Sequence, residues 1–266
     1  MRFVTSPENS VSSAEAAPPR LELRDVTHAY NDHWAVRGVS LSIRPGDVVA
    51  VVGPSGAGKT TLLRLMNGTL RPSMGVVAVD GRSLAALSAD ALRRVRASIG
   101  FVHQDLALVP NLRVVQNVMA GRLGRMGFFA SLRAMLFPPH ADLERAHAIL
   151  TRVGIGEKLF ARTDTLSGGQ QQRVAIARAL FQEPEALLAD EPVSSVDPAR
   201  ARDTVALMTS VSRERGLTLV MSLHNLELAR EFFPRLVGMR AGSVEFDRAA
   251  GDVTPHEFRA LYNLES

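Results

Sequence analysis

The chain has 266 residues, of which 46% are hydrophobic and 22% charged, with 31 lysines and arginines against 27 aspartates and glutamates. This composition is typical of a globular protein, and the absence of cysteine excludes disulfide scaffolds, zinc–thiolate sites, iron–sulfur clusters and cysteine nucleophiles. No apolar run reaches the roughly 18 residues that a membrane span needs, and the dispersed basic residues favour a solvated surface over a polyanion-binding patch.

Residues 1–19 are rich in Ser, Ala, Pro and Glu, and predict a disordered tail without a secretory signal. Residues 39–43 alternate apolar and polar side chains, as a half-buried strand does. Residues 48–52 are apolar on both faces, as in a central parallel strand. The remaining predicted strands are 21–26, 76–79, 99–102, 186–189, 217–222 and segments near 237 and 244. The predicted helices are 61–66, 89–97, 169–181, 198–213 and a short one from 225.

The alternation of strands and helices predicts an α/β fold with a mostly parallel central sheet. A helix-rich stretch over 112–160 interrupts this alternation, and it is broken by Gly121, Gly124, Gly127 and a Pro138-Pro139 pair. We therefore expect one domain over 20–266, with a helical subdomain inserted at 105–165.

A phosphate-binding loop follows the apolar 48–52 strand and precedes a predicted helix. Its residues match G-x-x-x-x-G-K-[ST] and are Gly53, Pro54, Ser55, Gly56, Ala57, Gly58, Lys59 and Thr60. Glycines let the backbone wrap closely round an anion, and successive N–H groups and the helix N-terminus direct positive charge at a phosphate. Lys59 supplies a cation for the outer phosphates, and the Thr60 hydroxyl is a Mg²⁺ ligand. The loop predicts a binding site for a nucleoside triphosphate rather than a Gly-rich turn that binds nothing.

Two carboxylates follow the short apolar strand at 186–189. Asp190 is placed to support Mg²⁺, and Glu191 lies one residue further on, where a loop can direct it at an attacking water. Because burying unpaired charge is costly, adjacent acids after a buried strand favour a functional role. As a general base, Glu191 would contribute roughly 10²–10⁴-fold in rate.

A second candidate phosphate cradle occurs at Leu166-Ser167-Gly168-Gly169-Gln170, just before a predicted helix. Ser167 is a good N-cap, so one interpretation is simply a capped helix behind a loop. The two glycines also open the backbone to an anion. Since one chain with one phosphate-binding loop does not need two cradles, we expect this one to serve the nucleotide of another copy.

These motifs resemble those of ABC-transporter nucleotide-binding subunits, over about residues 21–245. The elements that carry the resemblance are the phosphate-binding loop, Gln104, LSGGQ at 166–170 followed by Gln171-Gln172-Arg173, Asp190-Glu191-Pro192, Ser195-Val196-Asp197 and His224. The resemblance implies a P-loop NTPase fold with an N-terminal antiparallel β portion and an inserted helical subdomain. It also implies an ATPase that works as a head-to-tail dimer, with two ATP molecules held between the loop of one copy and the LSGGQ of the other.

The resemblance also implies roles for individual residues. Lys59, Thr60 and Thr61 would hold phosphates and Mg²⁺, and Gln104 would approach Mg²⁺ and the water. Glu191 would activate that water, and His224 would hold the γ-phosphate. Asp197 would organise the opposing site. Tyr30 lies at the position where the family stacks an aromatic ring on adenine, and Trp34 is the alternative residue for that role.

Departures from the family pattern are small: His103 precedes Gln104 where Phe is common, and Val196 replaces a common Leu. Segments 108–124, 125–137 and 222–229 resemble the ATPases of bacterial phosphonate importers. This resemblance implies integral-membrane permease subunits, a solute-binding protein outside the membrane, and a peripheral place on the cytoplasmic face of the bacterial inner membrane. The alternatives are an importer for another small solute, or an ATPase for lipoprotein release or export.

A soluble ABC ATPase that acts on DNA or ribosomes is a rival from another class. It would require long coiled coils or two fused ATPase units, and the sequence has neither, so we expect no nucleic-acid partner. The segment 125–137 has its own alternatives. Phe128, Leu132, Met135 and Leu136 share one helical face flanked by arginines, which fits an ordinary packed helix as well as a contact with a membrane subunit.

Overall fold

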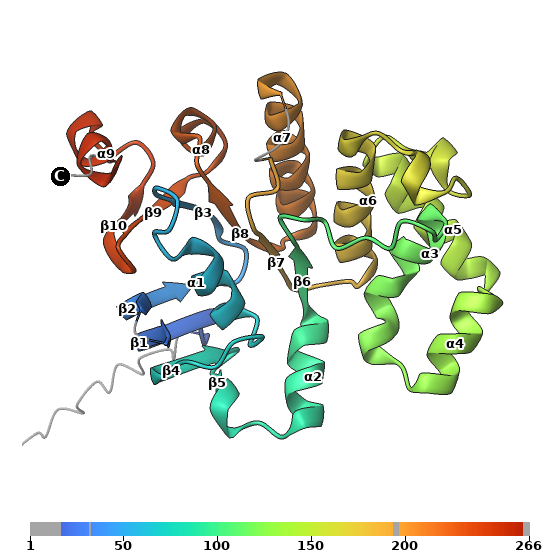
Figure 1. Cartoon of the computed structure of the whole chain (residues 1–266), viewed down its shortest axis with the longest axis horizontal. Helices are drawn as coiled ribbons and strands as arrows, with labels where there is room; N and C mark the ends of the chain where they lie inside the picture. Colours follow the sequence, from blue (N-terminus) through green and yellow to red (C-terminus); the bar gives the residue numbers. More distant parts are fainter. Residues whose placement is uncertain (1–16, 32, 194–196, 263–266) are drawn as a thin grey trace, which may run out of the picture.

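The structure is a computed structural model that describes residues 17–31, 33–193 and 197–262. Most of the predicted tail, and Ser195 and Val196, lie outside the described residues. Two sheets and two groups of helices make up the described part (Figure 1).

The larger sheet has six strands in the order β10-β9-β3-β8-β7-β6. Its strands are β3 (Val48–Val52), β6 (Ile99–Val102), β7 (Ala186–Ala189), β8 (Thr218–Leu223), β9 (Arg235–Arg240) and β10 (Ser243–Ala249). All neighbouring pairs are parallel except β10 with β9. Every residue of β3 is buried, so the prediction of a central strand covered on both faces is confirmed.

The smaller sheet is antiparallel, with the strand order β2-β1-β4-β5. Its strands are β1 (Leu21–Tyr30), β2 (His33–Ile43), β4 (Met74–Val79) and β5 (Arg82–Ser83). The alternation predicted for 39–43 is confirmed, because Val39, Leu41 and Ile43 are buried while the residues between them are exposed. This sheet is the antiparallel β portion that the family resemblance implied.

Helix α1 (Lys59–Met66) lies between the two sheets, where its apolar side chains pack with the faces of both. The other helices around the sheets are α2 (Ala89–Ser98), α7 (Pro198–Arg215), α8 (Leu226–Phe232), α9 (Pro255–Tyr262) and the 3-10 turn η1 (Leu84–Ala86). Alternate residues of β3 enter two different apolar clusters. Val49 and Val51 face α1, while Val48, Ala50 and Val52 share the second cluster with α7.

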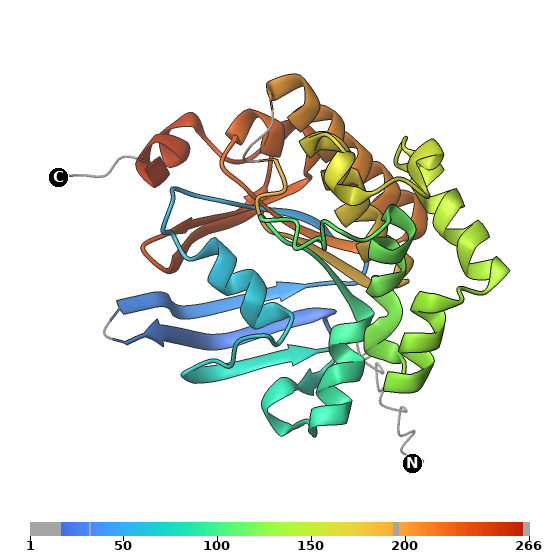
Figure 2. The ribbon, with the colours of Figure 1, turned by 45° about the vertical axis from the view of Figure 1, so that its right-hand side comes forward.

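A group of helices leaves the sheet after β6 and returns at β7 (Figure 2). Its members are α3 (Val114–Met119), η2 (Ala120–Arg125), α4 (Phe128–Leu136), α5 (His140–Arg152), η3 (Gly156–Lys158), η4 (Thr163–Thr165) and α6 (Gly168–Phe181). The breaks occur where the sequence predicted them, because η2 contains Gly121 and Gly124, and α4 lies between Gly127 and Pro138. Within the described residues, no helix is long and apolar enough to cross a membrane.

Candidate functional site

The candidate site lies at the carboxyl edge of the parallel sheet. Strands β3, β8 and β7 are parallel neighbours, and they end at Val52, Leu223 and Ala189. The phosphate-binding loop, His224 and the Asp190-Glu191 pair follow these three ends directly. Open α/β sheets bind ligands at this edge, so the topology brings together residues that lie far apart in the sequence.

The phosphate-binding loop is clamped between the two sheets. A Cβ atom at Gly53 would lie 2.1 Å from the Met239 carbonyl oxygen, and one at Gly58 would lie 2.2 Å from the Ala35 carbonyl oxygen. Gly58 also has a left-handed φ of +98°, which glycine adopts without strain. The Gly242 N–H donates to the Ala57 carbonyl at 3.1 Å. Backbone from both sheets therefore holds the two ends of the loop, at Gly53 and Gly58, while Ser55 and Gly56 between them are exposed.

Lys59 points into the loop and is only 3% exposed. Its ammonium donates to the carbonyl oxygens of Gly53 at 2.9 Å and Pro54 at 3.0 Å. Its Nζ lies 3.3 Å from Glu191 Oε1, and the same carboxylate oxygen is 2.5 Å from His224 Nε2. Burial lowers the pKa of Lys59, while the charges of Glu191 and Asp190 act to raise it. The cation of the loop, the proposed base and the proposed γ-phosphate ligand thus form one cluster.

Glu191 is held in an unusual backbone conformation, with a φ of +44°. A residue with a side chain has about 1–3 kcal/mol of strain in this region. The Glu191 N–H donates to the Ser222 hydroxyl at 2.8 Å, and that hydroxyl donates to Asp190 Oδ1 at 3.0 Å. Ser222 is fully buried. Its hydroxyl contacts both acids, yet no motif in the sequence marks Ser222 as a site residue, because only the pairing of β7 with β8 places it beside them.

Asp190 and Thr60 supply oxygen atoms suited to Mg²⁺. The Thr60 hydroxyl donates to Asp190 Oδ1 at 3.0 Å, and Asp190 is 3% exposed. Hydroxyl and carboxylate oxygens beside a phosphate cradle are the ligands that Mg²⁺ prefers, so this donor set fits the ion. Gln104, the third predicted ligand, has an exposed side chain with no hydrogen bond to any described residue, and it does not line the cavity in front of the loop.

A cavity of about 250 Å³ opens in front of the phosphate-binding loop. It is lined by His33, Ala35, Gly56, Ala57, Gly58, Lys59, Thr60, Thr61 and Glu191. Glu191 also lines an adjoining cavity of about 230 Å³ with Ser222 and His224. Tyr30 and Trp34 are both exposed and line neither cavity, so the choice between them for adenine stays a prediction.

The predicted second cradle begins α6, away from the phosphate-binding loop of the same chain. Ser167 caps the helix by accepting from the Gln170 N–H at 3.4 Å, and Gln170 Oε1 accepts from the Ser167 N–H at 3.0 Å. Gly168 is exposed and Gly169 half-buried, and neither lines the cavity of Lys59. In Figure 1, α6 and α1 lie in opposite halves of the molecule, separated by β6, β7 and α7.

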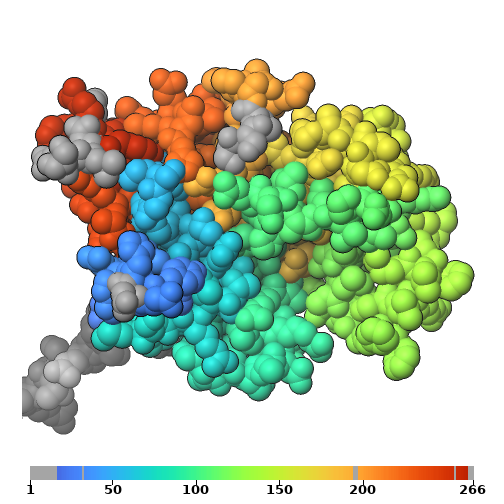
Figure 3. Space-filling model, in the orientation of Figure 1, coloured from blue at the N-terminus to red at the C-terminus, as the bar shows by residue number. Residues whose placement is uncertain are grey.

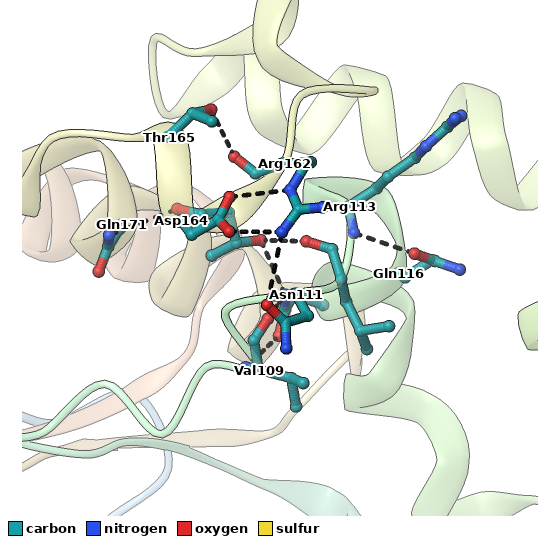
Figure 4. Close-up of polar contacts among 11 residues, drawn as sticks. Val109, Asn111, Arg113, Gln116, Arg162, Asp164, Thr165 and Gln171 are labelled. Atoms are coloured by element: carbon teal, nitrogen blue, oxygen red, sulfur yellow. Dashed lines mark hydrogen bonds and ion pairs between the residues drawn. The ribbon is translucent and has the colours of Figure 1, made fainter.

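Polar contacts brace the approach to this cradle (Figure 4). Arg162 donates to both carboxylate oxygens of Asp164, at 3.1 and 2.6 Å, and to Asn111 Oδ1 at 3.4 Å. Gln171 donates to the carbonyl of Leu166 at 3.1 Å. The loop before α6 is therefore tied both to the segment before α3 and to α6 itself.

Two further residues lie at helix ends near the site. Asp197 is the N-cap of α7, where it accepts from the Arg200 N–H at 3.0 Å, and it is half exposed. Tyr262, in α9, donates its hydroxyl to the His224 carbonyl at 3.2 Å. Burial raises the pKa of Tyr262, whereas a hydrogen bond from the Gly53 backbone lowers it. Tyr262 thus connects the loop to the segment of His224, a link that no motif in the sequence predicted.

Comparison with known proteins shows what the chain is similar to. The family described as ABC transporter matches residues 36–194. The phosphonate import ATP-binding protein PhnC 1 of Rhodopseudomonas palustris HaA2 is 44% identical over 92% of this chain and 87% of that protein. A PhnC 2 of Pseudomonas aeruginosa UCBPP-PA14 is 48% identical over 91% and 89%. PhnC of Anaeromyxobacter dehalogenans is 48% identical over 94% of this chain, which spans only half the length of that relative.

Solved structures agree on the fold. The dimeric structure of MJ0796, a bacterial ABC transporter cassette, superposes with a TM-score of 0.77 at 31% identity, covering 86% of this chain and 98% of that one. The structure of cbiO1 from Clostridium perfringens, part of the ABC transporter complex cbiONQ, gives a TM-score of 0.76 at 28% identity over 91% and 94%. The predicted P-loop NTPase fold is confirmed.

Proposed function

The chain belongs to the ABC transporter family, and on that premise we propose that it is the ATP-hydrolysing subunit of an importer for phosphonates or related phosphorus oxyanions. Its substrate in the chemical step is ATP. The energy of hydrolysis drives a separate permease, which carries the solute.

The cluster of Lys59, Glu191 and His224 is the observation that carries the ATPase assignment. In this structure the Glu191 carboxylate lies 3.3 Å from the Lys59 ammonium and 2.5 Å from the His224 ring. Phosphate oxygens are strong partners for the same two groups. When a γ-phosphate takes over Lys59 and His224, Glu191 loses both contacts. Its carboxylate then accepts a proton from the attacking water, so that base activation depends on the presence of substrate.

Thr60 and Asp190 would hold Mg²⁺, with Gln104 as a further oxygen ligand. The ion supplies charge neutralisation at the phosphates when bound. The rest of the loop has a simpler task. The N–H groups of Gly56, Ala57 and Gly58 and the start of α1 bind and orient the phosphates, and the exposed ring of Tyr30 stacks on adenine.

The signature residues Ser167, Gly168, Gly169 and Gln170 act on the ATP of a second copy in this proposal. Two observations support this arrangement: the residues are at an exposed helix N-terminus, and they do not line the cavity of their own phosphate-binding loop. Anions bind readily at such a terminus. Asp197, half exposed at the start of α7, lies at the same interface. A related cassette at 31% identity has a dimeric structure.

The import of phosphonates is supported by the relatives at 44–48% identity, which are named for that task. The proposed partners are a second copy of this chain, integral-membrane permease subunits and a periplasmic or surface solute-binding protein, with no nucleic acid. The proposed location is the cytoplasmic face of the bacterial inner membrane, bound peripherally through the permease.

Growth on single phosphorus sources tests this proposal. A strain lacking the gene is grown on a phosphonate, on phosphite or on phosphate, with the wild-type gene or a Glu191→Gln variant returned. We expect growth on the phosphonate to be lost and to be rescued by the wild type alone. Equal growth on all sources, in a strain with no second importer, would refute phosphonate import. Purified Glu191→Gln protein that hydrolysed ATP at the wild-type rate would refute the role of Glu191.

A further inference from the structure

Helix α4 exposes the face that a helix normally buries. Phe128 is 75% exposed and Phe129 84% exposed, and Leu132, Leu136 and Phe137 are also exposed. The one buried residue of α4 is Ala134, which is 8% exposed. At 3.6 residues per turn, Phe128, Phe129, Leu132 and Leu136 fall within about 100° of the helix circumference. Of the four residues predicted to share a face, Phe128, Leu132 and Leu136 are exposed and Met135 alone is half-buried, so most of this face does not pack within the chain as an ordinary packed helix would.

We call the five exposed side chains of Phe128, Phe129, Leu132, Leu136 and Phe137 the α4 ridge. Figure 1 shows α4 at the lower right of the molecule, below α3 and α5. The space-filling view shows yellow-green side chains on the surface at the same edge (Figure 3). A contiguous apolar surface of this kind in a protein marks a contact with another molecule or with a membrane.

The charges around the α4 ridge favour a membrane over another molecule as the contact. No acidic residue occurs between Asp105 and Asp142, whereas four arginines do: Arg113, Arg122, Arg125 and Arg133. Arg122 pairs with Asp142 at 3.2 Å. Arg133 is exposed on α4 itself and forms no ion pair with any described residue. An apolar stripe with arginine beside it, on a segment that carries no acidic residue of its own, is complementary to an anionic lipid surface.

A groove lies next to the segment that leads into α4. A groove of about 370 Å³ is lined by residues of α2, β6, η2 and α6, including Arg96, Gly121 and Arg178. η2 forms one wall of this groove and continues into α4, and Arg125 ties the two to α2 by donating to the Ala97 carbonyl at 2.8 Å. The proposed function has the subunit bound to a permease embedded in lipid, and a permease seated in this groove would bring α4 beside the bilayer.

We propose that the α4 ridge binds the anionic lipid surface of the membrane, with Phe128 and Phe129 inserted at the headgroup boundary and Arg133 on the lipid phosphates. The ridge thereby gives the subunit a membrane contact of its own, independent of the permease. An acyl layer adapts to a convex ridge without a preformed groove. The contact is peripheral and reversible, because α4 is far too short to span the bilayer.

Vesicle binding by the purified full chain tests the proposal. The probes are vesicles of phosphatidylcholine alone and of phosphatidylcholine mixed with anionic phosphatidylglycerol. We expect the chain to sediment with the anionic vesicles, and binding to weaken as salt is raised. The double substitution Phe128→Ser and Phe129→Ser should reduce binding at least tenfold, and Arg133→Glu should reduce it several-fold.

Two matched variants serve as controls. Phe160→Ser removes another exposed phenylalanine of the helical part, and Arg259→Glu reverses a charge on α9, at the opposite end of the molecule. Both should bind vesicles as the wild type does, and all variants should retain the wild-type melting temperature and basal ATP hydrolysis.

Failure of the wild-type chain to bind anionic vesicles would overturn the proposal, and so would equal binding by the double variant. Loss of binding to detergent-solubilised permease in the double variant, with vesicle binding unchanged, would assign the ridge to a protein partner and would likewise overturn it. None of these outcomes depends on the transported solute. Failure of the growth test on phosphonate would therefore leave the lipid contact standing.

Discussion

Ser222 offers the most direct test of how the site is held together. Its fully buried hydroxyl accepts from the Glu191 N–H at 2.8 Å and donates to Asp190 Oδ1 at 3.0 Å. Ser222→Ala removes both bonds without adding volume. A hydrogen bond to a charged group contributes about 1.5–3 kcal/mol and a neutral one about 0.5–1.5 kcal/mol. We expect the free energy of unfolding to fall by about 2–4.5 kcal/mol.

The same substitution should impair ATP hydrolysis more than ATP binding. Glu191 has a left-handed φ of +44°, and the Ser222 hydroxyl is the partner of its N–H. Without it the carboxylate moves away from the position of the water, and a displacement of about 1 Å can reduce the rate about 10²-fold. The phosphate-binding loop is untouched, so we expect ATP affinity to stay near the wild-type value while kcat falls at least tenfold.

Ser212→Ala is the matched control. Ser212 is as buried as Ser222, but its hydroxyl has no hydrogen-bond partner among the described residues. Its replacement should leave stability within about 0.5 kcal/mol or raise it, because an unpaired buried hydroxyl is itself unfavourable. Urea unfolding and ATP hydrolysis are measured on the same preparations. Equal behaviour of the two variants in both assays would refute the assigned role of Ser222.

Three further predictions concern the signature residue Ser167, the contact of Tyr262 with the His224 segment, and the titration of His103. Ser167→Arg should block ATP-driven dimerisation in gel filtration while one subunit still binds nucleotide, and loss of that binding would contradict a cradle that acts on the other copy. Tyr262→Phe should lower kcat by about 2- to 10-fold, since one hydrogen bond of about 0.5–1.5 kcal/mol to the His224 carbonyl is lost; an unchanged kcat would show that the bond has no effect on catalysis. Burial, and next the charge of Arg178, lower the pKa of His103. The unfolded chain therefore binds more protons below about pH 6.5, and stability falls on acidification through that range. His103→Phe should reduce the drop in melting temperature between about pH 7.5 and about pH 5.5. An equal drop in the variant and the wild type would show that His103 is not its cause.

The sequence predicted the sheet and the core of the site for one physical reason. Apolar strands followed by polar or glycine-rich residues place those residues at a shared carboxyl edge once the strands are parallel. This rule applies to Lys59 after β3, to Asp190 and Glu191 after β7, and to His224 after β8. Their convergence needs no detail beyond strand order.

The remaining features depend on tertiary contacts that no local pattern encodes. Ser222 is an unremarkable polar residue in an apolar strand until β7 pairs with β8. Tyr262 reaches the His224 segment only because α9 folds back over the sheet. Periodicity placed Phe128 and Leu132 on one face of α4, but it carries no information on whether that face points inward or outward. Gln104 shows the same limit, since its motif predicts a role but not the exposed position it has here.

The clamp on the phosphate-binding loop has a thermodynamic consequence for ligand entry. Backbone from Met239 and Ala35 packs closely against Gly53 and Gly58 at the two ends of the loop, and the Ala57 carbonyl accepts a hydrogen bond from the neighbouring hairpin. Nucleotide therefore meets a cradle whose conformational entropy was already lost when the chain folded. Calorimetric titration should then give a heat-capacity change no larger than the apolar surface buried by adenine accounts for, because no segment of the loop folds on binding.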